Sequence, residues 1–580
     1  MNIRRLVLFV VGAVLVMSVP LAAMAQSAED LTTLARYFPV ESPVFIGVRA
    51  DDDYLDSLDT LIDRVARVTD EQTPLPAGIR ESLTYLIGEL VPGGTFDNTI
   101  RAWMGDTFAL GINDLSVFVD DVQENDRDGF VVALDVQDAD ALRAFIEEVL
   151  IPNSDNVTNV ETLEVAGASV YEVLNDQGVL TYYAVFDDAA FISGSLIALE
   201  TVVISGSGLN TAAEFTGAFA ELPADQYNVV GFVNSPMLIE ASLASIAASE
   251  VQGELNLPGG GFGAAQAALQ QAGVVAFGAT VLDGRTLTID VAQLAGDTVP
   301  RASASVDPTF ARYIPAGTPL VIHGHDLAGG LNAALTAIRT TLAEANLEDV
   351  DAESLDDGLS MLNFFTRGTM ELDIQEDILS WMTGDFALTL ALADNFPSST
   401  EALMTSDEMP IEFGLLFEAT NPDLATALVA GLRRFAEMSA QDDSSVRVES
   451  VVEGGVEALR VTIDTPDAPF DVVLMAGTSG DVFVFGTQRM VTAALAPVNG
   501  LDSDPLYQEA AAYLLPNPAQ VWYFAGEPLM PLVELAHETE TVVFDSDPER
   551  LLTLFHSSSI SSLINENGTT LTRIAMTLPE

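Results

Sequence analysis

Four acidic residues, Glu124, Asp126, Asp128 and Asp135, have a spacing that could hold a calcium ion. The four acidic residues fall at positions 1, 3, 5 and 12 of an EF-hand-like loop, whose ligands are mostly carboxylate oxygens, and Gly129 falls at position 6. A glutamate opens this loop where aspartate is usual, and the pattern that follows predicts a strand rather than a helix. We therefore favour a solvated turn before a strand, with calcium as the alternative and as the one cofactor that the sequence suggests.

Two histidines form a second candidate metal-binding pattern. His323 and His325 are two residues apart on a predicted strand, which would place both imidazoles on the same face, a spacing that metal sites can use. The first half of the chain has Gly47 and Arg49 at the corresponding positions. Any such site would therefore be confined to the second half, and a structural role for the pair is the preferred interpretation.

The composition excludes several catalytic chemistries. The chain has no cysteine, and all 22 of its basic residues are arginine. Thiol nucleophiles, disulfides, lysine Schiff bases and phosphate-loop lysines are therefore absent. His537 and Glu538 begin like a zinc-protease helix, but Thr541 stands where the second histidine is required. Because the chain has 86 carboxylates, an acid–base pair can be neither named nor excluded, and no catalytic residue is assigned.

The charge balance limits the classes of partner. The formal net charge is −64, and no basic stripe is present to drive nucleic-acid binding by counterion release. Anionic lipid surfaces are disfavoured for the same reason. Cationic partners and divalent metals remain compatible with this surface. We therefore expect no nucleic-acid partner.

Residues 1–25 are typical of a secretory signal. Arg4 and Arg5 form the positive region, residues 6–17 form an apolar run, and the small residues at 23–25 suit cleavage before Gln26. An uncleaved anchor is the alternative, because residues 6–24 are nearly long enough to span a bilayer. We expect an exported chain, located outside the cytoplasm in the cell envelope, with no membrane span after cleavage.

The hydrophobic periodicity alternates between strand and helix along the rest of the chain. A helix is predicted to begin at Asp138, with Leu142, Phe145 and Val149 facing inward. Four consecutive short strands with hairpin-length turns predict antiparallel pairing. The fold class predicted is therefore α+β, with a mainly antiparallel sheet packed by helices. The predicted strands are 44–48, 107–112, 129–136, 160–165, 169–174, 179–186, 190–193 and 229–233.

Segments of the first half recur in the same order in the second half, at offsets between 276 and 293 residues. We therefore predict a signal at 1–25 followed by two tandem homologous repeats, 26–300 and 301–580. The tryptophan and aspartate that recur at 103–106 and 381–385 are interpreted as packing and turn residues. The recurring pairs are 37–39 and 313–315, 103–110 and 381–388, 130–136 and 413–419, 191–195 and 483–487, and 283–288 and 567–572.

Three of these segments carry a resemblance to a known family. The Tyr-Phe-Pro opening at 37–39, the Trp-Met-Gly-Asp segment at 103–106 and the strand ending Phe-Ile-Ser-Gly-Ser at 191–195 resemble DUF3352, a family of bacterial predicted-secreted proteins of unknown function. The resemblance implies export and fold. It implies no activity, so no catalytic residue is carried over.

Taken together, these features predict an acidic, secreted protein of the cell envelope that acts as a non-enzymatic binding or structural module. Its expected partners are a protein, a small apolar ligand or a cationic molecule. The high apolar content could line a ligand site or only fill two cores, and we favour the latter. The alternative is an extracytoplasmic hydrolase that uses carboxylates and is supported by calcium.

Overall fold

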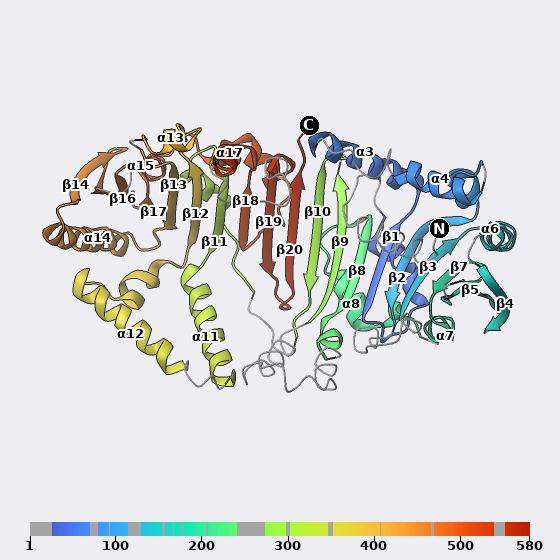
Figure 1. Ribbon diagram of the computed structural model, residues 1–580. Coiled ribbons are helices and arrows are strands. Elements are labelled where there is room, and N and C mark those ends of the chain that lie inside the picture. Colours follow the sequence, from blue (N-terminus) through green and yellow to red (C-terminus); the bar gives the residue numbers. More distant parts are fainter. Residues whose placement is uncertain are drawn as a thin grey trace. The chain divides into compact units, whose positions relative to one another are not determined.

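Antiparallel sheets covered by helices form the described part of the chain, so the predicted α+β fold class is confirmed (Figure 1). The computed structural model describes residues 26–69, 79–91, 93–113, 129–153, 157–165, 168–176, 178–204, 207–240, 273–282, 284–296, 302–345, 352–406, 408–465, 469–538 and 552–579. The predicted signal at 1–25 lies outside these ranges. The described residues divide into two units: unit 1 comprises those up to 296 together with Asn565–Thr572, and unit 2 comprises Ala302–Ile564 together with the residues from Arg573 onward.

The sheet of unit 1 has the strand order β4-β5-β6-β7-β3-β2-β1-β8-β9-β10, and every pairing along it is antiparallel. Strand β1 lies inside the sheet, between β2 and β8, which explains its continuous apolar sequence. The strands are β1 (Val44–Arg49), β2 (Met104–Ile112), β3 (Phe130–Val136), β4 (Val157–Val165), β5 (Ala168–Asn175), β6 (Leu180–Val185), β7 (Ala189–Ser193), β8 (Val229–Asn234), β9 (Val274–Leu282) and β10 (Thr286–Gln293).

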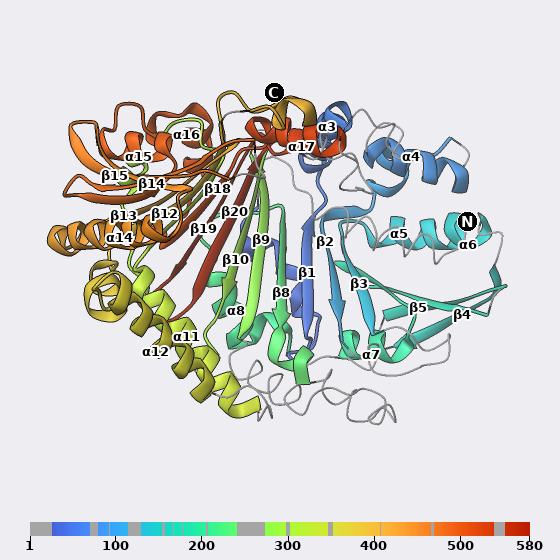
Figure 2. The same cartoon turned by 60° about the vertical axis from the view of Figure 1, so that its left-hand side comes forward.

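Helices cover both faces of this sheet and create two cores. Tyr182 and Tyr183, neighbours on β6, belong to different cores, as the alternation of side chains along a strand requires. In Figure 2, α5 and α6 lie on one side of β3 and β5, and α7 lies on the other. The helices are α2 (Ala28–Leu31), η1 (Thr33–Arg36), α3 (Asp52–Thr69), α4 (Ile79–Leu90), η2 (Phe96–Ile100), α5 (Ala139–Phe145), η4 (Ile146–Leu150), α6 (Ile151–Asn153), α7 (Leu196–Ile204), η5 (Leu209–Thr211) and α8 (Ala213–Ala220).

The helix predicted at Asp138 is present, with Leu142 buried and Phe145 packed on the same core as predicted, but the third residue of its predicted inward face differs. Asp138 caps α5, where its side chain accepts a hydrogen bond from the amide of Ala141. The next turn, η4, is a π-helix, which shifts the phase of the residues that follow. As a result Ile146 and Leu150 are buried, whereas Val149, which the sequence placed on the inward face, is only partly buried.

Unit 2 has the strand order β14-β15-β16-β17-β13-β12-β11-β18-β19-β20, the same order as unit 1 when strands are counted along the chain. The strands are β11 (Leu320–His325), β12 (Asp385–Leu392), β13 (Ile411–Glu418), β14 (Val446–Glu453), β15 (Val456–Ile463), β16 (Val472–Thr478), β17 (Val482–Gly486), β18 (Gln520–Phe524), β19 (Ser557–Ile564) and β20 (Thr570–Thr577). The helices are η7 (Pro308–Tyr313), α11 (Leu327–Ala345), α12 (Ala352–Thr369), η8 (Ile374–Ile378), η9 (Leu379–Trp381), α13 (Thr400–Leu403), α14 (Pro422–Asp442), α15 (Gln488–Leu495), η10 (Leu501–Ser503), α16 (Pro505–Ala511), η11 (Glu527–Leu529) and α17 (Met530–Glu538).

Local contacts also recur between the two units. An isolated bridge joins Pro39 to Gly208 in unit 1 and Pro315 to Gly500 in unit 2. The guanidinium of Arg36 lies over the ring of Tyr37 at 4.8 Å. That of Arg312 lies over Tyr313 at 4.7 Å. The units thus share their strand order and these two details.

Within the described ranges, no helix combines the length and the apolar character needed to cross a bilayer.

Candidate functional site

An apolar cavity of about 250 Å³ lies inside unit 1. Helices α3, α4, η2 and α5, with the π-turn η4, form one wall, and strands β2, β3, β6 and β7 form the other. Arg49 is the one charged residue that lines it. Natural cores contain few voids larger than a water molecule, so an apolar space of this size needs an explanation. Its lining includes Leu55, Leu83, Ile87, Phe96, Ile100, Trp103, Leu134, Leu142, Phe145, Ile146, Tyr183, Ala184, Val185, Ala190 and Ile192.

The helical wall of the cavity is formed by apolar residues at helical spacing. On α3, Leu55, Leu58 and Leu61 are buried at intervals of three residues. On α4, Leu83 and Ile87 are four residues apart, and both line the cavity. Packing these two amphipathic faces against the sheet explains why the helices lie where they do. The cavity lies between these two helices and the sheet.

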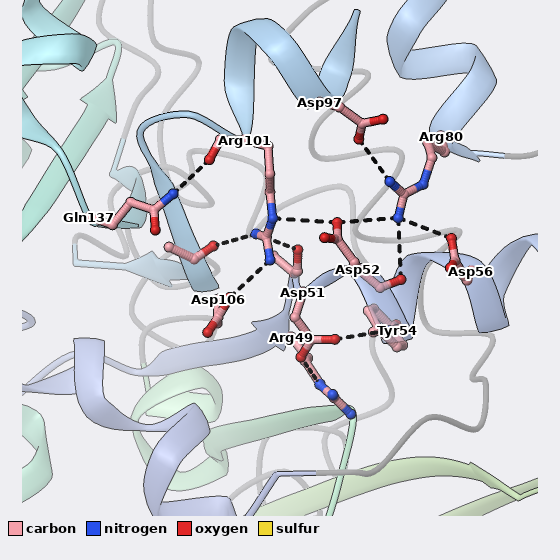
Figure 3. Close-up of polar contacts among 12 residues, drawn as sticks. Arg49, Asp51, Asp52, Tyr54, Asp56, Arg80, Asp97, Arg101, Asp106 and Gln137 are labelled. Carbon is pink, nitrogen blue, oxygen red and sulfur yellow. Dashed lines mark hydrogen bonds and ion pairs between the residues drawn. The ribbon is translucent and has the colours of Figure 1, made fainter.

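Arg80 joins the three helical elements of this wall (Figure 3). Its guanidinium pairs with Asp97 of η2 at 2.8 Å and with Asp56 and Asp52 of α3 at 3.0 and 3.3 Å. Partial burial lowers the pKa of Arg80, but the three carboxylates raise it more, and the net shift is upward. Arg80 therefore holds α4, α3 and η2 together as a charged cross-link.

Arg101, at the end of η2, joins α3 to the sheet (Figure 3). It donates to the carbonyls of Ala50 and Gly105 at 3.2 and 3.0 Å, and it pairs with Asp106 of β2 at 3.0 Å and with Asp52 of α3 at 3.4 Å. Its side chain is 19% exposed, so these contacts are better protected from solvent than a surface ion pair. We call Arg80, Arg101 and their carboxylate partners the arginine clamp.

Trp103 has a buried polar atom without a partner. Its side chain lines the cavity, and among the described residues its indole N–H finds no acceptor. In unit 2 the corresponding Trp381 donates to the carbonyl of Asp377 at 3.1 Å. Trp381 also packs edge-on against Phe483 in a hydrophobic core of unit 2. A buried donor without an acceptor costs about 1–3 kcal/mol of stability.

Comparison with known proteins places the chain in a family. The profile of a family described as "Protein of unknown function (DUF3352)" matches residues 5–578. The chain belongs to the DUF3352 family. The resemblance inferred from the sequence is confirmed over nearly the whole chain, and the family carries no activity with it.

No curated protein matches this DUF3352 chain. Among solved structures, crystal forms I and III of TP0453 are similar at 12% sequence identity. They cover 46% of this chain and 80 and 81% of TP0453, with TM-scores of 0.23 and 0.24. Scores this low carry no argument about the fold or function of the DUF3352 chain.

The predicted calcium loop is only partly described. Glu124, Asp126 and Asp128 lie outside the described residues. Asp135 lies on β3, where its carboxylate accepts a hydrogen bond from the amide of Asp106 at 3.2 Å. Burial raises the pKa of Asp135 above its ordinary value. Within the described ranges no group of three or more potential ligands could hold a metal ion.

The two histidines of β11 share a face, as predicted, and both bind one carboxylate. Asp385 accepts from His325 Nδ1 at 2.7 Å, from His323 Nε2 at 3.3 Å and from the amide of Asp307 at 2.6 Å. His323 also stacks on Phe310 at 5.4 Å. The cluster therefore ties β11 and β12 to the chain entering unit 2. The recurrence of Gly-Asp drew attention to Asp385, but only the strand register, which sets it opposite His325, could have indicated this partner.

Proposed function

We propose that this DUF3352 protein is an exported, non-enzymatic binding protein of the cell envelope whose unit 1 holds a small apolar ligand. The observation that carries the proposal is the apolar cavity beneath α3, α4 and η2. Its volume of about 250 Å³ is just below the roughly 300–1,000 Å³ of most ligand pockets. At the roughly 30 Å³ that a water occupies in the liquid, the cavity has room for about eight methylene-sized groups. A medium-length acyl chain fits these limits.

The lining of the cavity exposes only apolar surface, so burial of the ligand's apolar chain would provide the binding. Arg49 also lines the cavity, but it already pairs with Asp51.

Export and the location in the cell envelope rest on the sequence. Residues 1–25 have the three parts of a secretory signal. The strongly negative charge, −64 for the full chain, would keep the exported chain soluble and away from anionic surfaces. A periplasmic or extracellular carrier of apolar molecules is consistent with both features.

The two-repeat organisation, 26–300 and 301–580, is also a proposal, of a tandem duplication. Its support is the identical strand order of the two units and the matching bridges at Pro39 and Pro315. In this view one copy kept Trp381 in a hydrophobic core with a partner for its indole N–H, and the other opened a cavity beside Trp103.

The hydrolase alternative requires two carboxylates free to exchange protons across a cleft. Asp106 and Asp135 lie close together in unit 1, but Asp106 pairs with Arg101 and Asp135 binds the Asp106 amide. Both carboxylates therefore hold strands and helices in place. At this pair of carboxylates the geometry favours a structural role over hydrolysis.

Titration with decanoate tests the proposal. At about 0.8 kcal/mol per buried methylene, eight groups correspond to a Kd on the order of 10–100 µM. We expect the delipidated, purified chain to bind decanoate in this range by calorimetry, at one site. The absence of binding would contradict the proposal.

Two variants locate the site. Ala190→Leu projects a larger side chain into the cavity, so it should abolish decanoate binding while leaving the melting temperature unchanged or raised. Ala276→Leu is the control, because Ala276 is equally buried but lies on β9, outside the cavity lining. It should bind decanoate normally and lose about 1–3 kcal/mol of stability through overpacking. Equal binding by both variants would place the site elsewhere.

A further inference from the structure

Unit 2 contains a second, larger cavity of a different character. It has a volume of about 1130 Å³ and lies over β14, β15 and α15. Three arginines line it, Arg447, Arg460 and Arg489, in a chain that has only 22. Carboxylates line it as well, so it is a polar site with both signs of charge.

Two of the three arginines are already paired. Arg447 binds Asp471 at 2.9 Å, and Arg489 binds Asp394 at 3.0 Å. The guanidinium of Arg460 has no hydrogen bond or ion pair to any residue that the structure describes, and its Nε is buried. Carboxylates outnumber arginines by 86 to 22 in this chain, so a half-buried arginine without one is unexpected.

Glu449 is an exposed carboxylate on the neighbouring strand. It stands directly opposite Arg460 across the β14–β15 pair, and within the described ranges it too has no side-chain hydrogen bond or ion pair. Cβ atoms of directly opposite residues are about 4.5–5.5 Å apart. An unpaired cation and an unpaired anion therefore lie side by side on the same wall of the cavity.

The corresponding place in unit 1 has a different charge pattern. The two sheets can be aligned strand by strand through their paired residues. In this alignment Arg460 of β15 falls at the position of Glu172 of β5, and Glu449 of β14 falls at that of Glu161 of β4. Glu161 and Glu172 face each other as two like charges. The fold therefore does not require an arginine here, and the opposite-charge pair is particular to unit 2.

We propose that this cavity binds a zwitterionic ligand of the amino acid or short peptide class, whose carboxylate pairs with Arg460 and whose ammonium pairs with Glu449. A purely anionic ligand would meet four lining carboxylates, those of Glu408, Glu412, Glu449 and Asp471. A purely cationic ligand would meet three arginines. A ligand carrying one charge of each sign satisfies both unpaired groups. This function is separate from that of the apolar cavity and does not depend on it.

The test uses alanylalanine and its blocked forms on the full purified chain. We expect alanylalanine to bind by calorimetry, with N-acetyl-alanylalanine and alanylalanine amide each at least tenfold weaker, because each lacks one of the two charges. Arg460→Gln and Glu449→Gln should each weaken alanylalanine binding at least tenfold. Arg460→Lys, which keeps the charge, should retain part of the binding and guards against a merely structural loss.

Arg433→Gln is the matched control. Arg433 lies on α14 and contacts Ser450 and Glu457 of the same two strands, outside the cavity lining. It should bind alanylalanine like the unmodified chain. Failure of alanylalanine to bind, equal binding of the blocked forms, or equal losses in Arg433→Gln and Arg460→Gln would each overturn the proposal.

Discussion

His325 and Asp385 face each other across the β11–β12 pair, with 2.7 Å between Nδ1 and a carboxylate oxygen. The carboxylate is 2% exposed and also receives His323 and the amide of Asp307. Burial alone would raise the pKa of Asp385, but these hydrogen bonds outweigh it and hold the pKa below its ordinary value. The folding of unit 2 is therefore coupled to the ionisation of this carboxylate.

Acid should weaken unit 2 through Asp385. Because the pKa is lower in the folded state than the ordinary value of about 3.9, the unfolded chain takes up the proton first. The stability that the ionised Asp385 carboxylate gives to unit 2 is present above about pH 5. It is lost as the pH falls through 4 toward the folded-state pKa. Urea unfolding of the unit 2 transition between pH 7 and 3 should show this slope, and Asp385→Asn should flatten it. Asp502→Asn, at an exposed position, is the control and should leave this slope unchanged. If Asp385→Asn shows the same slope as the unmodified chain, the coupling is refuted.

Loss of Arg101 should loosen the helical wall of the apolar cavity. Arg101→Gln removes hydrogen bonds to Ala50 and Gly105 and ion pairs to Asp52 and Asp106. We expect unit 1 to lose about 1.5–3 kcal/mol, measured by urea unfolding, and decanoate to dissociate faster. Arg339→Gln is the control, because Arg339 and its partner Asp356 are both exposed, and the loss should stay below about 1 kcal/mol. Equal losses in the two variants would mean that the arginine clamp has no structural role.

Two glycines should respond in opposite directions to alanine. A Cβ at Gly47 would lie 2.2 Å from the carbonyl oxygen of Leu31, which is backbone and cannot turn aside, so Gly47→Ala should cost about 1–3 kcal/mol. A Cβ at Gly330, inside α11, meets nothing within 4 Å. Gly330→Ala should therefore gain about 0.5–1 kcal/mol from helix propensity. Thermal melting of both variants checks the signs, and a neutral Gly47→Ala would contradict the close approach of α2 to β1.

Salt should stabilise the whole chain at low ionic strength. The net charge of −64 repels itself over a screening length of about 30 Å at 0.01 M salt, which shrinks to about 8 Å at 0.15 M. We expect the melting temperature to rise between these concentrations. A flat profile would instead indicate that the carboxylates are paired or buried.

The sequence predicted the strands well because their apolar runs are short and bounded by turn residues. Strand β1 was predicted to within one residue, and β3 likewise. The match between the recurring segments at Phe191 and Phe483 was less accurate. The strand registers set Phe191 opposite Ala133 and Val484 opposite Leu416, so the two units differ there by one residue. Sequence similarity matches the two aromatic residues, whereas the hydrogen-bonded strands match Phe191 with Val484.

The candidate sites were beyond prediction from sequence for physical reasons. A cavity depends on how side chains of α4 and β7 fail to fill space, and an apolar pattern is the same for a filled core. The missing acceptor of Trp103 and the missing partner of Arg460 are likewise properties of geometry. The histidine pair was recognised, but its partner Asp385 lies 60 residues from His325 along the chain.

Crystals of the purified chain held under xenon pressure test the central claim most directly, because xenon occupies dry apolar cavities. We predict a xenon peak in unit 1 enclosed by Ile87, Phe145 and Ala190, and its loss in Ala190→Leu. Crystals of the chain that show no xenon at this place in unit 1, but side chains or ordered water filling it, would contradict the account.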